Sequence, residues 1–128
     1  MDKMDKKNVT GISALLVHAA KIDEIYSQHE KNLIKNFIRS YLKDDNDEEI
    51  LREAEIIESN SNQLLSFTNI IKKKQMETKR DILEHLWKIV ISDKTVDQYE
   101  SNLMRRICGL IYFSDKECAE IKLKLLKL

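Results

Sequence analysis

The sequence has no proline and only two glycines in 128 residues. Because proline and glycine bound most strands and tight hairpins, their scarcity argues against a β-rich fold and favours helices. It also excludes a glycine-rich phosphate-binding loop and a nucleophile elbow, since both need several glycines at fixed spacing. The sequence therefore predicts an all-α protein without these nucleotide-binding and hydrolase motifs.

The sequence also has few cysteines and no formal net charge. Two cysteines, Cys108 and Cys118, are too few for the disulfide framework of a small secreted protein, so a reducing cytoplasm is the expected location. Both fall at or beside apolar helical positions, where a buried thiol acts as a small hydrophobic group. With 22 basic and 22 acidic residues, no net field draws the chain toward nucleic acid or an anionic membrane.

No apolar segment is long enough to cross a bilayer. The run over residues 12–20 is interrupted by His18 and followed by Lys21. The first residues are charged, so we expect a flexible N-terminus over residues 1–10 and one domain over residues 11–128. A domain of this length buries about two thirds of its unfolded surface and needs no metal or disulfide to fold.

Apolar residues recur at the i, i+3, i+4 spacing of amphipathic helices along almost the whole domain, and about seven helices are expected. The first is expected to begin near Gly11. The central stretch, residues 82–110, contains two such patterns on either side of an acidic joint at residues 92–100. This arrangement predicts a helical hairpin around that joint.

The two halves of the chain repeat with a shift of 70 positions. Each copy reads as a helix, an acidic joint and a capped helix, and one such hairpin cannot bury its apolar face alone. Two hairpins packed together, with the third and fourth helices as an insert, would form one helical bundle. Its core should contain the apolar faces of both hairpins, which comprise Leu16, Leu33, Phe37, Leu86, Trp87, Leu103 and Ile107.

The joint SDKTVDQYE at residues 92–100, preceded by Leu86-Trp87 and followed by Arg105-Arg106-Ile107, resembles the TerB tellurite-resistance family. The similarity covers nearly the whole chain. It implies a single TerB-like bundle of two related halves and a non-enzymatic role in tellurite, metal or general stress resistance. A similar domain stands at the N-terminal side of a membrane-anchored DnaJ-like co-chaperone, but this sequence has no His-Pro-Asp tripeptide.

The resemblance also implies that the acidic joints hold a divalent cation. The matching acids are Asp23 and Glu30 in the first joint, and Asp93, Asp97 and Glu100 in the second. Because these ligands are oxygens, Ca²⁺ or Mg²⁺ is the candidate ion.

Helix capping is the favoured role of these acids. Ser27 with Glu30, and Asp97 with Glu100, have the spacing of a capping box, in which both side chains bind free N–H groups at a helix start. The family usually has glycine after the first aspartate of each joint, whereas the second joint has Lys94, whose charge weakens a cation site. No cofactor is therefore required by the sequence.

No catalytic constellation is apparent, since His18, His29 and His85 lie far apart and lack the i, i+4 spacing of a zinc site. Two functions remain. The first is a TerB-like module that binds an unidentified protein partner, with or without a divalent cation. The alternative is a ligand-free structural or regulatory interaction domain related to that of the co-chaperone. Either is expected to bind neither nucleic acid nor membrane, and to be a monomer or weak homodimer.

Overall fold

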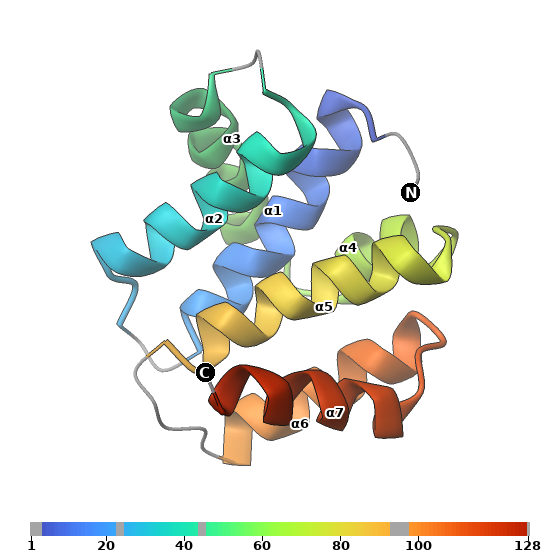
Figure 1. Ribbon diagram of the computed structural model, residues 1–128. Coiled ribbons are helices and arrows are strands. Elements are labelled where there is room, and N and C mark those ends of the chain that lie inside the picture. Colours follow the sequence, from blue (N-terminus) through green and yellow to red (C-terminus); the bar gives the residue numbers. More distant parts are fainter. Residues whose placement is uncertain (1–3, 23–24, 44–45, 93–97, 128) are drawn as a thin grey trace.

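The computed structural model describes residues 4–22, 25–43, 46–92 and 98–127, and every regular element in these ranges is an α-helix (Figure 1). The elements are α1 (Lys6–Ala20), α2 (Gln28–Tyr41), α3 (Asp47–Ser59), α4 (Leu65–Lys72), α5 (Met76–Val90), α6 (Gln98–Leu110) and α7 (Asp115–Leu126). The predicted all-α fold of about seven helices is confirmed. None of the described helices is long and apolar enough to cross a bilayer.

Helix α1 begins at Lys6, ahead of the expected start at Gly11. Asp5 caps it, because its carboxylate accepts a hydrogen bond of 2.7 Å from the backbone N–H of Asn8. Residues 6–10 of the segment expected to be flexible therefore belong to this helix. The helix extends this far because Val9 is fully buried and packs into the core.

Helix α1 is the centre of the bundle and packs against α2, α3, α4 and α5. Every residue from Val9 to Ala20 except His18 is buried, as expected for a helix that is apolar on nearly all sides. Of the predicted core residues Leu33 is only partly buried, because Ile34, Phe37 and Ile38 form the inner face of α2. The other predicted core residues are buried: Leu16, Phe37, Leu86, Trp87, Leu103 and Ile107.

The internal repeat is visible in the helices themselves. Helices α1 and α5 each have 15 residues and begin 70 positions apart, as do the starts of α2 and α6. Near those starts, Gln28 Nε2 donates to Asn32 Oδ1 at 3.1 Å, and Gln98 Nε2 donates to Asn102 Oδ1 at 3.0 Å. The predicted repeat is therefore present in the register of the helix starts, in the lengths of α1 and α5, and in this matching pair of hydrogen bonds.

The repeat also extends further than the sequence indicated. Helix α3 packs against α1 and α2, and helix α7 packs against α5 and α6. Each half is thus a three-helix unit. Helix α4 lies between the two units in the chain, and α1 and α2 also pack directly against α5. The assignment of the third helix to an insert was wrong, because α3 packs in the first half as α7 does in the second. The sequence did not indicate this relation, since α3 and α7 have no obvious pattern in common.

Both acidic joints are flanked by elements on one side of the molecule. Figure 1 shows the C-terminal ends of α1 and α5 near one another on that side, with the N-terminal end of α2 at its edge and that of α6 at the bottom. The backbone closes α1 and α5 in the same way, since Lys21 N–H bonds Val17 O at 3.0 Å and Ile91 N–H bonds Trp87 O at 2.9 Å. The fold therefore presents two equivalent helix starts on the same side of the molecule.

Candidate functional site

Two of the predicted cation ligands lie in the described part of the chain, Glu30 and Glu100. Asp23, Asp93 and Asp97 lie outside the described residues. Glu30 is the third residue of α2 and Glu100 the third of α6, and their exposed fractions are 5% and 4%. Equivalent positions of the repeat therefore each carry a buried glutamate.

Glu30 closes the predicted capping box with Ser27. Its Oε1 accepts hydrogen bonds from the backbone N–H of Ser27 at 2.9 Å and from Ser27 Oγ at 3.2 Å. Ser27 Oγ in turn accepts a bond of 3.2 Å from the backbone N–H of Glu30. These bonds satisfy N–H groups that a helix start leaves free, and the helix dipole favours the negative charge there. The capping prediction is confirmed for this joint.

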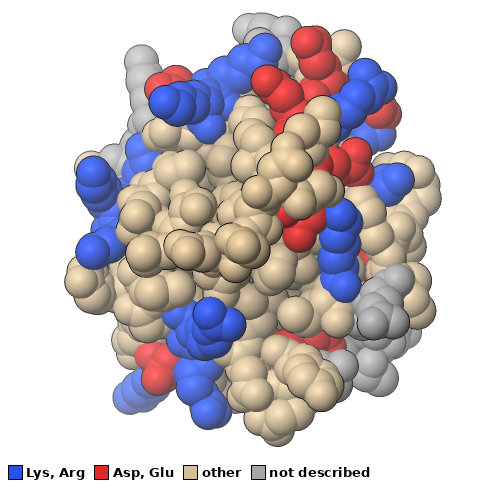
Figure 2. All heavy atoms as spheres, turned by 180° about the vertical axis from the view of Figure 1, so that it is seen from behind, with Lys and Arg blue, Asp and Glu red and all other residues tan. Residues whose placement is uncertain are grey.

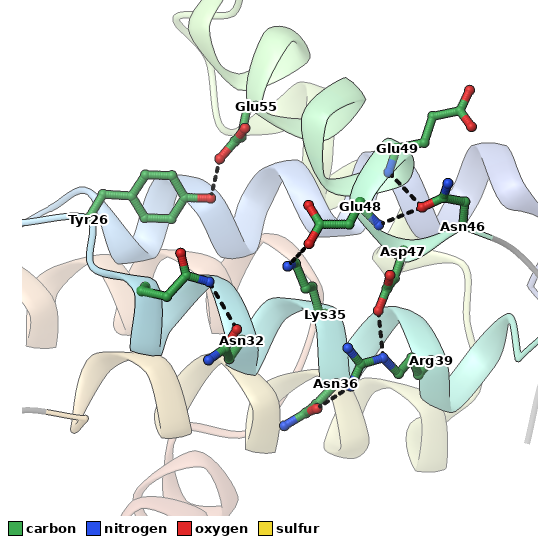
Figure 3. Close-up of polar contacts among 11 residues, drawn as sticks. Tyr26, Asn32, Lys35, Asn36, Arg39, Asn46, Asp47, Glu48, Glu49 and Glu55 are labelled. Atoms are coloured by element: carbon green, nitrogen blue, oxygen red, sulfur yellow. Dashed lines mark hydrogen bonds and ion pairs between the residues drawn. The ribbon is translucent and has the colours of Figure 1, made fainter.

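Tyr26, just before the capping box, connects the first joint to α3. Its hydroxyl donates a hydrogen bond of 2.6 Å to Glu55 Oε2 (Figure 3). Burial, then the hydrogen bond and charge of Glu55, and then the charge of Glu30 raise the pKa of Tyr26 well above its ordinary value. The phenol is therefore a fixed hydrogen-bond donor at neutral pH rather than a titrating group.

Further along α2, charged pairs attach α3 in the same region (Figure 3). Lys35 is paired with Glu48, and Arg39 Nε lies 2.5 Å from Asp47 Oδ2. Asn46 caps α3 by accepting hydrogen bonds from the first turn of its backbone. The two ion pairs hold α2 against α3, and the cap closes the start of α3. These charged groups therefore stabilise the fold.

The described residues do not by themselves form the cation site that the family resemblance implies. Among them, no group of three or more His, Cys, Asp or Glu side chains is placed to hold a metal ion. One carboxylate oxygen of Glu30 already accepts both hydrogen bonds of the capping box. The described part of each joint is therefore a helix start that contains a buried glutamate, Glu30 in α2 and Glu100 in α6.

A pocket of about 460 Å³ lies where α1, α3, α4 and α6 approach one another. Leu64 and Phe67 are largely buried in it, while Leu65 is 47% exposed. This pocket was not predicted from the sequence, because the polar residues 59–62 indicate only a break between helices. The lining residues are His18, Glu58, Ser61, Asn62, Gln63, Leu64, Leu65, Phe67, Arg106 and Leu110.

Two ionisable groups of this pocket, His18 and Glu58, are paired with each other. Glu58 Oε1 accepts a hydrogen bond of 2.8 Å from Lys21 Nζ, and Glu58 Oε2 lies 3.2 Å from His18 Nδ1. Burial alone would raise the pKa of Glu58, but the hydrogen bonds from Lys21 and His18 outweigh it and hold the pKa below its ordinary value of 4.5. Ser61 Oγ bonds the backbone of Gln63. The pocket therefore contains a stabilised carboxylate but no serine activated by the histidine.

The pocket lies next to a surface with little charge. Figure 2 shows the molecule from behind, where α3 and α4 lie, with uncharged side chains across the middle and charged groups around them. On these two helices Ile56, Ile57 and Leu65 are 55%, 39% and 47% exposed. Apolar residues surrounded by a polar rim are typical of protein-binding surfaces.

The fold and these features define a small helical module with two related halves, two buried acids at equivalent helix starts, and a pocket lined by both apolar and polar residues. The chain matches the family described as Tellurite resistance protein TerB over residues 10–123. It therefore belongs to the TerB family. No curated protein and no solved structure matches the chain. Similarity to the co-chaperone domain stays a prediction.

Proposed function

We propose that this chain is a non-enzymatic TerB-like module of a tellurite, metal or general stress response that binds a partner protein. The binding surface in this proposal is the pocket between α1, α3, α4 and α6. The observation that carries it is the combination of buried Leu64 and Phe67 with half-exposed Leu65, inside a rim that includes Arg106. A partner side chain entering this pocket would bury apolar area against a polar border, as in the centre of protein interfaces.

A non-enzymatic role is supported by the pairing of His18, Glu58 and Ser61 in the pocket. Nucleophilic catalysis needs a hydroxyl or thiol hydrogen-bonded to a base. Here His18 lies against Glu58, while Ser61 Oγ is engaged with the backbone of Gln63. Because Glu58 is held by Lys21 as well, its carboxylate is a poor proton acceptor near neutral pH. The pocket has the composition of a binding surface.

The matched test compares two exposed leucines on different helices. Leu65 lines the pocket, whereas Leu123 on α7 is 54% exposed and does not line it. Since both side chains are about half in water, Leu65→Asp and Leu123→Asp should leave the circular dichroism spectrum and melting temperature nearly unchanged. Quantitative affinity capture from the native cell should then recover a partner with wild type and Leu123→Asp, but not with Leu65→Asp. Equal recovery by both variants would contradict the proposal.

We further propose that no cation is required, and that Glu30 and Glu100 act at the helix starts. Glutamine replaces glutamate well in a capping box but is a poorer ligand for a hard cation. Glu30→Gln and Glu100→Gln should therefore change stability little, and Ca²⁺ or Mg²⁺ should not shift the melting temperature of wild type. A cation-dependent rise in wild type that either variant removes would instead support a site at the joints.

The rival function is a ligand-free structural or regulatory domain related to that of the co-chaperone. In that case the same capture would recover a chaperone whose binding does not depend on Leu65. The cytoplasm is the proposed location in both cases, since Cys108 and Cys118 are free thiols. A monomer or weak homodimer is proposed, and sedimentation at two concentrations distinguishes these states.

A further inference from the structure

Two thiols meet where α6 packs against α7, below α5 in Figure 1. Cys108 lies in the last turn of α6 and Cys118 in the first turn of α7, and their exposed fractions are 0% and 5%. Both are free, and each is the largest influence on the pKa of the other, through an interaction between the two thiols. They therefore form a buried dithiol that the bundle does not need for charge balance or helix capping.

The turn between the helices places the thiols together. Tyr112 has φ of 59°, in the left-handed region, and the N–H of Phe113 bonds the carbonyl of Cys108 at 2.9 Å. This is the bond that closes a helix in a Schellman motif. Because Cys108 itself accepts that bond, the end of α6 and the position of its thiol are fixed by the same turn.

Cys118 has polar surroundings that a simple core cysteine does not need. Trp87 Nε1 donates a hydrogen bond of 3.3 Å to Cys118 Sγ. Cys118 also lines a pocket of about 180 Å³ whose wall includes Lys122, Arg105 and Asp115. Lys122 Nζ lies 5.6 Å from the centre of the Trp87 ring. A small molecule in this pocket would therefore reach Cys118, and two of the three charged groups around it are cations.

The two thiols differ in acidity. The interaction with Cys108, and then the hydrogen bond from Trp87, lowers the pKa of Cys118, although burial and Asp115 oppose this. The interaction with Cys118, together with burial, raises the pKa of Cys108. Cys118 is thus the sulfur that ionises first, and Cys108 keeps its proton.

We propose that Cys118 and Cys108 form a peroxide-reactive pair, in which Cys118 is oxidised through the pocket and Cys108 then closes a disulfide between α6 and α7. In the first step the Cys118 thiolate attacks a hydroperoxide oxygen. An S–O bond forms, the O–O bond breaks, and the departing oxygen takes a proton to leave as alcohol or water.

In the second step the Cys108 sulfur attacks the sulfenic sulfur of Cys118. The S–S bond forms, the S–O bond breaks, and the Cys108 proton leaves with the hydroxide as water. The pair has then given two electrons to the peroxide. This inference does not depend on the partner-binding pocket, because the residues that line the two pockets are different.

The structure supplies a readout, because Trp87 is the single tryptophan of the chain and its indole contacts Cys118. Hydrogen peroxide at neutral pH should change the fluorescence of wild type while mass spectrometry shows the loss of two hydrogen atoms within one chain. Cys108→Ser should stop at one added oxygen that a sulfenic-acid reagent traps on Cys118. Cys118→Ser should react at least about tenfold more slowly than wild type, since its remaining thiol is the protonated one.

A surface pair of lysines keeps the test independent of changes at the buried thiols. Lys122→Gln removes a pocket cation and should slow the oxidation about threefold, whereas Lys124→Gln, on the exposed part of α7, should not change the rate. Three results would each overturn the proposal: wild type that reacts no faster than Cys118→Ser, a disulfide formed only between chains, or oxidation of Cys118 beyond sulfenic acid without any disulfide.

Discussion

The two glycines provide a matched test of how α1 packs against α4. Both Gly11 and Gly109 lie in helices, where alanine is favoured over glycine by about 0.5 to 1 kcal/mol. A Cβ added at Gly109 would meet nothing within 4 Å. A Cβ added at Gly11 would lie 2.5 Å from Ile70 Cδ1 and 4.0 Å from Ile70 Cγ1. The two substitutions therefore share one backbone effect and differ in one contact.

Gly109→Ala should raise the free energy of unfolding by about 0.5 to 1 kcal/mol. For Gly11→Ala the same gain is opposed by the contact with Ile70 Cδ1. That atom is the end of a partly buried side chain, so it can move at the cost of an unfavourable rotamer, about 0.5 to 1.5 kcal/mol. Gly11→Ala should therefore lie between a gain of about 0.5 kcal/mol and a loss of about 1 kcal/mol, below the gain expected at Gly109.

Ile70→Val isolates this contact, because it removes Cδ1 and keeps Cγ1. Alone it should cost about 0.5 to 1 kcal/mol. In the Ile70→Val background, Gly11→Ala should recover its full helical gain, so that the double-mutant cycle gives a coupling of about 1 kcal/mol. Urea unfolding followed by Trp87 fluorescence and circular dichroism measures each free energy. If Gly11→Ala were as stabilising as Gly109→Ala in both backgrounds, the packing of α4 on α1 described above would be refuted.

Four other substitutions test the core, the α6 turn and the pH response. Leu86→Ala should lower the free energy of unfolding by about 2 to 5 kcal/mol, because Leu86 is fully buried. A loss under about 0.5 kcal/mol in urea unfolding would contradict that burial. Tyr112→Gly should stabilise by about 0.5 to 1 kcal/mol in the same assay, since glycine adopts the left-handed conformation without strain; a loss would mean that the Tyr112 ring matters more than its backbone. Burial lowers the pKa of His85 below 6.5, so the unfolded chain binds that proton first and stability should fall as the pH drops below about 6.5. His85→Gln should flatten this part of a plot of melting temperature against pH. Glu58 has a pKa below 4.5 in the fold, so its contribution is present above that pH and is lost further into acid, and Glu58→Gln should flatten only that acid limb.

Much of the fold was predictable because it depends on local signals. Apolar spacing predicted the helices, and the spacing of Ser27 and Glu30 predicted a capping box that the structure contains. The early start of α1 was missed because the cap at Asp5 precedes charged residues rather than an apolar stripe. Leu33 was misplaced because sequence spacing alone does not distinguish the centre of a helix face from its edge.

The features that suggest function depend on contacts between distant residues. Cys108 and Cys118 were each predicted at apolar positions, but their contact requires a turn with Tyr112 in a left-handed conformation, which its residue type does not indicate. The hydrogen bond from Trp87 to Cys118 joins different helices, as does the pairing of His18 with Glu58. The pocket at the junction of α1, α3, α4 and α6 likewise exists only after these helices have packed.

The central claim is that the TerB-like module binds a protein through this pocket. Hydrogen–deuterium exchange of the chain, with and without the captured partner, measures it most directly. The account predicts slower exchange in residues 59–67 and 106–110, which surround the pocket, with no change in α7. Protection confined to α7 or to the start of α2, with unchanged exchange around Leu65, would contradict it.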